Sequence, residues 1–236
     1  MQALIIAAGA GTRQRENGES KPLIPLKGQT IIERVISSCK EANIKEIFIT
    51  VGYKADKIKT FLGDGSQLGL KITYIDNSEW EKGNGTSVYC AKNIIKTPFI
   101  LLMSDHIFDS TILKKLQEKK YTDDECLLCV DKKPKGYLDV DDATKVLIEG
   151  DTIIAINKKL VKYNGIDTGI FLSTSAMFEA LEESILMRKY SLSDANQILA
   201  DERRLKAVDV SDYSWIDIDD DMGLKNAEKL LREESL

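Results

Sequence analysis

The sequence IIAAGAGTRQRENGESKPL (residues 5–23) joins an apolar segment to a loop of small residues. The continuous apolar run over residues 3–8 is typical of a buried strand. The loop at residues 9–12 contains two glycines, and two cations, Arg13 and Lys21, follow it. Glycine lets backbone N–H groups approach an anion closely, because no Cβ intervenes. The stretch therefore predicts a first strand that ends in a phosphate-binding loop.

Two common phosphate-binding motifs do not fit this loop. The dinucleotide fingerprint needs a third glycine where Gln14 stands, and the P-loop needs Gly-Lys-Ser/Thr, which is absent here. Two interpretations remain. One is a tight turn with solvated cations, and the other is a triphosphate cradle in which Arg13 and Lys21 neutralise developing charge. A dinucleotide-dependent oxidoreductase is disfavoured by Gln14 and by the Lys21-Pro22 continuation.

The rest of the first half alternates between strand and helix patterns. We expect helices at 30–43, 56–62 and 86–95 and strands at 46–51, 70–75 and 99–103. Thr30 and Glu33 form a capping-box pattern at the first of these helices. Apolar strands that alternate with helices indicate a parallel sheet covered on both faces, with ligands beyond the carboxyl ends of the strands.

The second half is less regular and predicts an antiparallel elaboration. Segments 145–148 and 152–156 flank Gly150-Asp151 as a hairpin, and strands are expected at 168–172 and 205–210. Helices are expected at 176–186, at 222–232, and to residue 200 after a Ser193 cap. We expect an α/β fold with a doubly wound mixed sheet, in one domain over 1–236, with the elaboration within about 132–170.

Composition narrows the class of protein. The net charge of -5 disfavours a nucleic-acid partner, which would require a basic face. No apolar run approaches the roughly 20 residues of a membrane span, and the N-terminus lacks the basic region of a signal peptide. We therefore expect a cytoplasmic protein without membrane insertion.

The cysteines and the histidine exclude some kinds of site. The four cysteines, Cys39, Cys90, Cys126 and Cys129, are expected to be free thiols. The last two have redox spacing but lie in a strand pattern, where residues three apart point to opposite faces. Core packing is therefore favoured over a redox or metal site. The single histidine, His106, excludes a site built on several imidazoles.

The segments AAGAGTR and KPLIPLKGQTIIERVI resemble the signature of the nucleoside-triphosphate transferases, the nucleotidyltransferases that activate sugar phosphates and similar alcohols. The resemblance implies a Rossmann-like sheet of the nucleotidyltransferase type. It implies that the loop wraps a triphosphate through Ala7, Ala8, Gly9, Ala10, Gly11 and Thr12. It also implies that Arg13 and Lys21 contact the phosphates and assist attack at the α-phosphorus.

Several carboxylates are candidates for a metal site. Asp105 follows the strand at 99–103, where ligands are expected. Alternation along an extended segment puts Asp217 and Asp219 on one face, with isoleucines on the other. An EF-hand fails because Met222 stands where that loop needs glycine. The nearby pair of aspartates at 220 and 221 is expected to cap the last helix.

The family resemblance assigns roles to these carboxylates. It implies that Asp105 and Asp217 bind the metal, with Asp219 as a second ligand beside Asp217; the residues alone do not separate the last two. The expected cofactor is Mg²⁺, which one or two carboxylates and substrate phosphates usually hold.

The segment WEKGNGTSVY matches the family region that recognises the base and ribose. The resemblance implies that Gly83 and Gly85 let the backbone close on the base, while Asn84, Thr86 and Ser87 supply polar contacts. Without the resemblance, the segment is a loop leading to a helix capped by Thr86 or Ser87. The two interpretations are compatible.

The combination of EKGNGTS, MSDHIF and KKLVKYNGIDTGIF is most similar to cytidylyltransferases that act on inositol 1-phosphate. That resemblance implies transfer of CMP from CTP to inositol 1-phosphate, giving CDP-inositol and pyrophosphate. Lys159 is then the preferred contact for the acceptor phosphate, ahead of Lys158. Asp167 accepts from ring hydroxyls, and His106 is a further candidate for acceptor binding.

Alternatives remain open at this point. One is a hexose-1-phosphate or phosphocholine nucleotidyltransferase, and another is an inactive nucleotide-sensing subunit. The presence of Arg13, Lys21, Asp105 and Asp217 together favours an active enzyme. Known members are often fused to a membrane-embedded alcohol phosphotransferase. We expect this chain to stand alone and to work with a separate enzyme of that kind.

Overall fold

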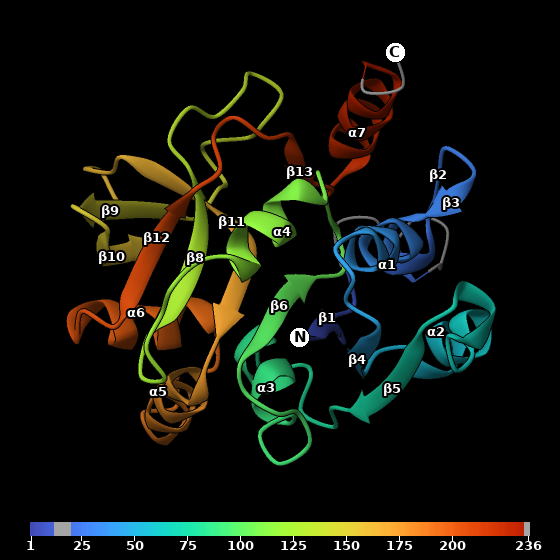
Figure 1. Ribbon diagram of the computed structural model, residues 1–236, viewed down its shortest axis with the longest axis horizontal. Helices are drawn as coiled ribbons and strands as arrows, with labels where there is room; N and C mark the ends of the chain where they lie inside the picture. Colours follow the sequence, from blue (N-terminus) through green and yellow to red (C-terminus); the bar gives the residue numbers. More distant parts are fainter. Residues whose placement is uncertain (12–19, 234–236) are drawn as a thin grey trace.

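The computed structural model describes residues 1–11 and 20–233. Within these residues, nine strands form one sheet in the order β5-β4-β1-β6-β11-β8-β12-β10-β9 (Figure 1). The strands are β1 (Gln2–Ala7), β4 (Glu46–Val51), β5 (Lys71–Asp76), β6 (Phe99–Met103), β8 (Cys126–Asp131), β9 (Lys145–Glu149), β10 (Thr152–Asn157), β11 (Gly165–Ser173) and β12 (Leu205–Asp209). The predicted α/β fold with a mixed sheet is confirmed.

The first four strands in that order are parallel. In the register, Ala7 at the end of β1 lies beside Val51 of β4, and Ile6 lies beside Met103 of β6. The carboxyl ends of these strands therefore meet at one edge of the sheet. Strand β11 is antiparallel to β6 and β8, while β8 and β12 are parallel. The predicted hairpin is β9-β10, and it forms the far edge of the same sheet.

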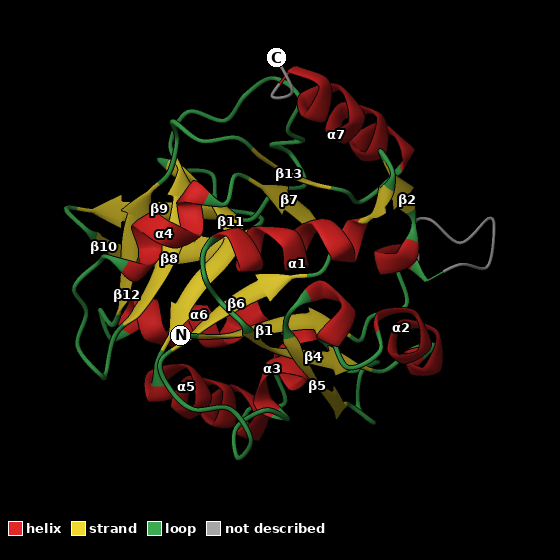
Figure 2. Cartoon of the chain, turned by 45° about the vertical axis from the view of Figure 1, so that its right-hand side comes forward, coloured by secondary structure: helices red, strands yellow, loops and turns green. Residues whose placement is uncertain are grey.

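Helices cover both faces of the sheet, as Figure 2 shows. Helices α1 (Ile31–Glu41), α2 (Ala55–Leu62) and α4 (Thr111–Gln117) pack in the apolar cluster on one face. Helices α3 (Asn84–Tyr89), α5 (Ser175–Leu186) and α6 (Leu192–Asp201) pack in the cluster on the other. No helix in the described ranges is long and apolar enough to span a bilayer.

The cysteines confirm the strand interpretation. Cys126 packs in one face cluster and Cys129 in the other, so the two thiols lie on opposite sides of β8. Both are buried, free thiols, as is Cys39. Burial raises the pKa of the Cys126 thiol and of the Cys39 thiol, the latter to about 12. These cysteines are therefore core residues.

A smaller unit lies beyond the carboxyl ends of the parallel strands. It contains β7 (His106–Phe108), which pairs antiparallel with β13 (Trp215–Asp217), together with helix α7 (Asp221–Glu233) and the short strands β2 (Pro25–Leu26) and β3 (Gln29–Thr30). A third apolar cluster joins these pieces: Leu26, Ile31, Ile107, Ile216, Ile218, Ala227 and Leu230. This pairing brings the Asp217 segment across from the residues that follow β6.

Several predicted boundaries were wrong. The helix expected at 86–95 is α3, which begins at Asn84 after a Gly83 cap and ends at Tyr89. The cap of α6 is Ser191, not Ser193, because Ser191 forms the reciprocal capping box with Asp194. Helix α4 and the β7-β13 pair were not predicted. Their segments are too short to show a period.

Candidate active site

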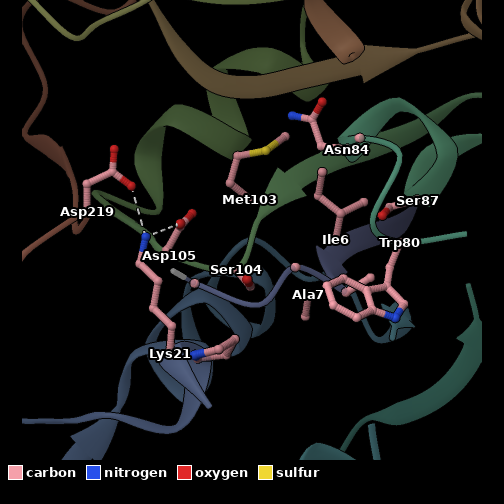
Figure 3. Close-up of a pocket in the computed structure, with 15 residues that line it drawn as sticks. Ile6, Ala7, Lys21, Trp80, Asn84, Ser87, Met103, Ser104, Asp105 and Asp219 are labelled. Carbon is pink, nitrogen blue, oxygen red and sulfur yellow. Dashed lines mark hydrogen bonds and ion pairs between the residues drawn. The ribbon is translucent and has the colours of Figure 1, made fainter. Parts of the chain in front are cut away.

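The first cavity, of about 330 Å³, lies at the carboxyl ends of β1 and β6 (Figure 3). This is where ligands bind in open α/β sheets. It is lined by Ile6, Ala7, Ala8, Gly9, Gly11, Lys21, Pro22, Trp80, Gly83, Asn84, Ser87, Met103, Ser104, Asp105 and Asp219. The predicted loop residues Ala7, Ala8, Gly9 and Gly11 are in this lining. Ala10 is not in it, and Thr12 and Arg13 lie outside the described residues.

Gly11 has a specific structural reason to be glycine. Its φ of +57° lies in the left-handed region, which a side chain disfavours. A Cβ at this position would also come within 2.8 Å of the Lys21 Cβ. The glycine therefore lets the loop lie against the Lys21 side chain, so the loop and the cation share one wall of the cavity.

Lys21 is the cation of the described site. Its Nζ lies 2.6 Å from Asp105 Oδ2 and 3.0 Å from Asp219 Oδ1, and its side chain is only 10% exposed. Burial alone would lower the pKa of Lys21, but the two carboxylates outweigh burial and raise it. Lys21 is therefore a fixed positive charge in the cavity at neutral pH.

Three carboxylates meet beside this lysine. The backbone N–H of Ile218 donates to the carbonyl of Asp105 at 3.0 Å, which joins the two acidic segments. Ile216 and Ile218 are buried in the third cluster, so Asp217 and Asp219 face the cavities, as the alternation predicted.

The charges of these carboxylates are not equivalent. Burial would raise the pKa of Asp105, but the Lys21 ammonium lowers it and prevails. Burial raises the pKa of Asp217, and the neighbouring Asp219 and Asp105 carboxylates raise it further. Asp217 therefore lies in a concentration of negative charge that a bound cation would relieve.

The donor set fits Mg²⁺. Carboxylate oxygens are its preferred protein ligands, and it is usually held by one or two of them with substrate phosphates. Asp105 and Asp217 are the residues that would hold it, with Asp219 beside them. In the described part of the chain, no three acidic, histidine or cysteine side chains form a complete metal cage.

The start of α3 divides the predicted nucleotide contacts into two groups. Gly83, Asn84 and Ser87 line the cavity, whereas Gly85 and Thr86 do not. A Cβ on Gly85 would lie 2.7 Å from the Tyr190 carbonyl, and the Gly85 N–H donates to that carbonyl. Gly85 therefore permits packing of α3 on the segment before α6, and its predicted contact with the base stays a prediction.

The hydroxyl groups at this helix start also have internal partners. Thr86 Oγ1 donates to the Gly83 carbonyl at 2.7 Å, and Asn77 Nδ2 donates to the hydroxyls of Thr86 and Ser87. Thr86 therefore holds the loop together, and its predicted contact with the nucleotide stays a prediction. Ser87 accepts the internal hydrogen bond from Asn77 and also lines the cavity.

Trp80 is a cavity residue that sequence reasoning missed. It lines the first cavity, and its ring lies 5.5 Å from that of Tyr53. A Cβ on Gly52 would come within 2.7 Å of Trp80 Cβ and 2.9 Å of the Ala8 carbonyl. The only sequence signal was an aromatic residue just before the Gly-Asn-Gly loop and a glycine directly after β4.

A second cavity, of about 160 Å³, adjoins the first. The two share Asn84, Met103 and Asp219. The remaining lining comes from the second half of the chain, apart from His106: Asp142, Ala143, Thr144, Lys158, Asp167, Gly169, Phe171, Leu192, Ser193, Asn196, Trp215 and Asp217. Of the two cavities, Lys21 and Asp105 line only the first and Asp217 lines only the second, but Lys21 pairs with the shared residue Asp219.

His106 and Asp167, which are predicted to contact the acceptor, both line this second cavity. His106 Nδ1 lies 2.8 Å from the Thr168 carbonyl, and its Nε2 lies 3.6 Å from Asp105 Oδ1. The ring fits there because a Cβ on Gly169 would come within 2.6 Å of it. Burial raises the pKa of Asp167 to about 6, although its carboxylate accepts from the Gly169 N–H.

Of the two adjacent lysines, only Lys158 lines the second cavity. Its Nζ lies 3.2 Å from Asp142 Oδ1 across the cavity mouth. Lys145, which is buried, donates to the carbonyls of residues 141, 143 and 158 and so fixes this mouth. Lys159 is exposed and outside the lining, because the turn places neighbouring side chains apart. The geometry thus favours Lys158 over Lys159, reversing the predicted order.

The arrangement suits the transfer of a phosphorylated group between two substrates. One cavity has a glycine loop and a buried cation, and the other has a polar wall, with carboxylates between them. The charged groups described at the junction are the Lys21 ammonium and the carboxylates of Asp105 and Asp219, so the chemistry would depend on positioning and charge. A nucleotidyl-transfer site has these properties.

Comparison with known proteins agrees with this class. The family described as "Nucleotidyl transferase" matches residues 2–233, and the chain belongs to that family. The chain is 34% identical over 233 residues to a protein of Aquifex aeolicus named "Bifunctional IPC transferase and DIPP synthase", with 97% of this chain and 51% of that protein covered. The chain spans about half the length of the curated relatives it matches.

Two further comparisons bear on relatives and fold. A "Bifunctional protein GlmU" of Methanococcus maripaludis is 32% identical over 223 residues, covering 92% of this chain and 51% of that protein. The structure of the inositol-1-phosphate CTP transferase from T. maritima superposes with a TM-score of 0.85 at 24% identity, covering 98% of this chain and 95% of that chain. The predicted nucleotidyltransferase fold is thus confirmed.

Proposed function

We propose that this protein transfers CMP from CTP to inositol 1-phosphate, with CDP-inositol and pyrophosphate as products. The observation that carries the proposal is that two unlike cavities share Asp219, which pairs with Lys21 beside Asp105. A transferase of this kind needs two substrates side by side with their reacting phosphates at one point. The relatives named IPC transferase support this choice of substrates.

The nucleotide belongs in the first cavity. Its triphosphate would lie on the backbone of the glycine loop, with Lys21 at its side and Arg13 as the predicted second cation. The base would lie toward Trp80 and Ser87, where the cavity offers an aromatic face and a hydroxyl. Stacking on an aromatic ring does not distinguish between bases, so the polar groups near Asn84 would have to select cytosine.

The acceptor belongs in the second cavity. Lys158 at its mouth is the candidate for the acceptor phosphate, with Lys159 as the alternative, and Asp167 would accept from ring hydroxyls. His106 lies between Asp105 and β11 and would border both substrates. The product is an activated alcohol that a separate alcohol phosphotransferase would use.

The chemistry follows from the charges at the junction. A phosphate oxygen of the acceptor attacks the α-phosphorus of CTP in line, a new P–O bond forms, and the bond to the β-phosphate oxygen breaks. The attacking oxygen is already ionised, so no base and no covalent enzyme intermediate are needed. Lys21 would offset the negative charge that grows on the phosphates. Mg²⁺ bound by Asp105 and Asp217 would supply further charge neutralisation.

The direct test is pyrophosphate release by the purified protein. CTP, UTP, dTTP, GTP and ATP are each paired with inositol 1-phosphate, glucose 1-phosphate and phosphocholine, in the presence of Mg²⁺. We expect strong release only with CTP and inositol 1-phosphate, and none when EDTA replaces Mg²⁺. Lys21→Ala is the control that separates enzyme turnover from contaminating activity.

Other outcomes have definite meanings. Release with a hexose 1-phosphate would keep the reaction class and discard inositol 1-phosphate as the acceptor. Silence across all pairs, with CTP still raising the melting temperature, would contradict catalysis and favour a nucleotide-sensing role.

A further inference from the structure

One buried polar atom in the second cavity lacks a partner. Asn196 on α6 is 1% exposed, and its Oδ1 accepts no hydrogen bond from any described residue. The side chain lines the cavity, one turn after Leu192 and beside Ser193 on the same face of the helix. Buried polar atoms are almost always hydrogen-bonded, so this atom requires an explanation.

A second atom of the same kind shows what is special about Asn196. The hydroxyl of Ser173, at the end of β11, is also buried and without a partner. Ser173 lines neither of the two cavities, whereas Asn196 lines the second. Of these two residues, Asn196 alone belongs to the lining of one of these cavities.

The neighbouring groups indicate what kind of ligand would satisfy it. Asp167, in the same cavity, is a second acceptor, and its carboxylate uses only the Gly169 N–H among its neighbours. Phe171 and Trp215 add apolar surface, and the Trp215 ring is fixed by its Nε1–H, which donates to Asp131 at 3.0 Å. A ligand that matches this wall offers several O–H donors on a compact ring.

We propose that Asn196 Oδ1 accepts a hydrogen bond from one ring hydroxyl of the acceptor and thereby selects a polyhydroxylated ring. The inference rests on the proposed function, since it assigns the second cavity to the acceptor. Sites built to bond a hydroxyl reject analogues that lack it, because the buried partner is then left unpaired. Phosphocholine has no hydroxyl to offer, so Asn196 selects against it.

The experiment compares three variants with the wild-type protein. Asn196→Leu keeps the volume and removes the acceptor, and Asn196→Asp keeps an acceptor oxygen. Ser173→Ala is the matched control, because it removes the other unpartnered oxygen away from the cavities. Steady-state kinetics use CTP with inositol 1-phosphate and with each of its monodeoxy analogues, and thermal unfolding is recorded without ligand.

In the wild type, we expect one monodeoxy analogue to lose about 10- to 100-fold in kcat/KM. Asn196→Leu should lose a similar factor with the parent acceptor and show no further loss with that analogue. The KM for CTP should stay within about twofold, and Asn196→Asp should lose less than Asn196→Leu. Ser173→Ala should match the wild type.

Thermal unfolding distinguishes recognition from a structural role. Replacement of an unpaired buried oxygen by an apolar group of similar shape is neutral or stabilising. Asn196→Leu should therefore melt at the same temperature as the wild type or higher when no ligand is present. A clear fall in its melting temperature would show that Asn196 supports the fold, and it would overturn the inference.

Steady-state kinetics can also overturn the inference about Asn196 while leaving the proposed function intact. Normal turnover of inositol 1-phosphate by Asn196→Leu, with the deoxy analogue still discriminated, contradicts the role of Asn196 and leaves the proposed function intact. Absence of wild-type turnover with inositol 1-phosphate contradicts the proposed function, and the variants are then measured with the acceptor that does react. If that acceptor is phosphocholine, the inference also fails.

Discussion

The two cavities are built in different ways. The first is lined by residues 6–105 together with Asp219, and three of its residues are glycines. The second is lined mainly by residues 142–217, together with Asn84, Met103, His106 and Asp219. The first cavity therefore belongs largely to the half of the chain that carries the glycine loop, and the second belongs largely to the half that follows it.

This difference separates the general chemistry from the choice of substrate. A glycine loop with a buried lysine can hold any nucleoside triphosphate, because phosphates are common to all of them. The acceptor wall has specific donors and acceptors, and their exchange would change the alcohol that binds. Fold does not fix the acceptor, so that choice rests on a few side chains such as Asn196 and Asp167.

The largest expected effect is at the junction that both cavities share. Lys21→Ala removes the buried positive charge that pairs with Asp105 and Asp219, so we expect kcat to fall by about 10²- to 10³-fold. Lys82→Ala is the control, because Lys82 is an exposed lysine that lines neither cavity and contacts Glu79 and the Tyr190 ring. Pyrophosphate release measures both variants. A near-normal rate in Lys21→Ala would remove that residue from the mechanism.

Removal of a carboxylate charge at Asp105 or Asp217 should raise the Mg²⁺ concentration that the reaction requires. Asp105→Asn and Asp217→Asn each remove a negative charge, and we expect the Mg²⁺ concentration for half-maximal rate to rise by about 10- to 100-fold. Asp109→Asn is a control, since that residue lies on the same segment but outside both cavities. A Mg²⁺ titration of the rate tests the prediction. An unchanged requirement in both site variants would place the metal elsewhere.

A smaller effect should show that CTP and the acceptor bind in separate cavities. Gly52→Ala would push a methyl group against Trp80 and the Ala8 carbonyl. A displaced Trp80 would contact the nucleotide less well, so we expect the KM for CTP to rise about tenfold. The KM for the acceptor should not change. Gly136→Ala is the control, because no atom lies within 4 Å of the Cβ it would add. Equal changes in both KM values would contradict the division into two cavities.

The smallest effect concerns stability in the second cavity. The pKa of Asp167 is about 6 in the folded protein and near 3.8 in the unfolded chain, so the folded state binds this proton more tightly. Its contribution to the free energy of unfolding therefore falls as the pH rises from about 4 to 6.

Asp167→Asn cannot ionise and keeps an oxygen for the Gly169 N–H. Relative to wild type, it should gain about 1–2 kcal/mol of stability between pH 4 and pH 7.5, after allowance for partial solvent screening. Urea unfolding at the two pH values measures the difference. A stability difference that does not change with pH would contradict the raised pKa.

Local signals explain what the sequence could predict. Strand β4 has the expected bounds, and the Thr30–Glu33 capping box is present, because both depend on neighbouring residues. The glycine loop and Asp105 were predicted because they directly follow strands whose ends must meet. Asp217 and Asp219 were predicted from their alternation with isoleucines, and Lys21 was predicted from the motif that continues the loop. The Asp220 cap is also present, since its side chain accepts from the Gly223 N–H.

Contacts between distant segments explain what was missed. Strands β7 and β13 are three residues each, and their pairing depends on burial of Ile107 and Ile216 in one cluster. Asn196 stands among the apolar residues of α6, where the pattern predicts only a helix. Its lack of a partner becomes visible only when the helix is packed against α5 and β10. The choice between Lys158 and Lys159 likewise depended on the direction of one turn.

The central claim is that nucleotide and acceptor occupy separate cavities that meet at Lys21 and Asp105. A crystal structure of the protein with CDP-inositol and Mg²⁺ tests it most directly. The account predicts cytidine beside Trp80 in the first cavity, the diphosphate at the junction, and the inositol ring in the second cavity with a hydroxyl on Asn196. An inositol ring bound outside the second cavity, or a cytidine bound within it, would contradict the account.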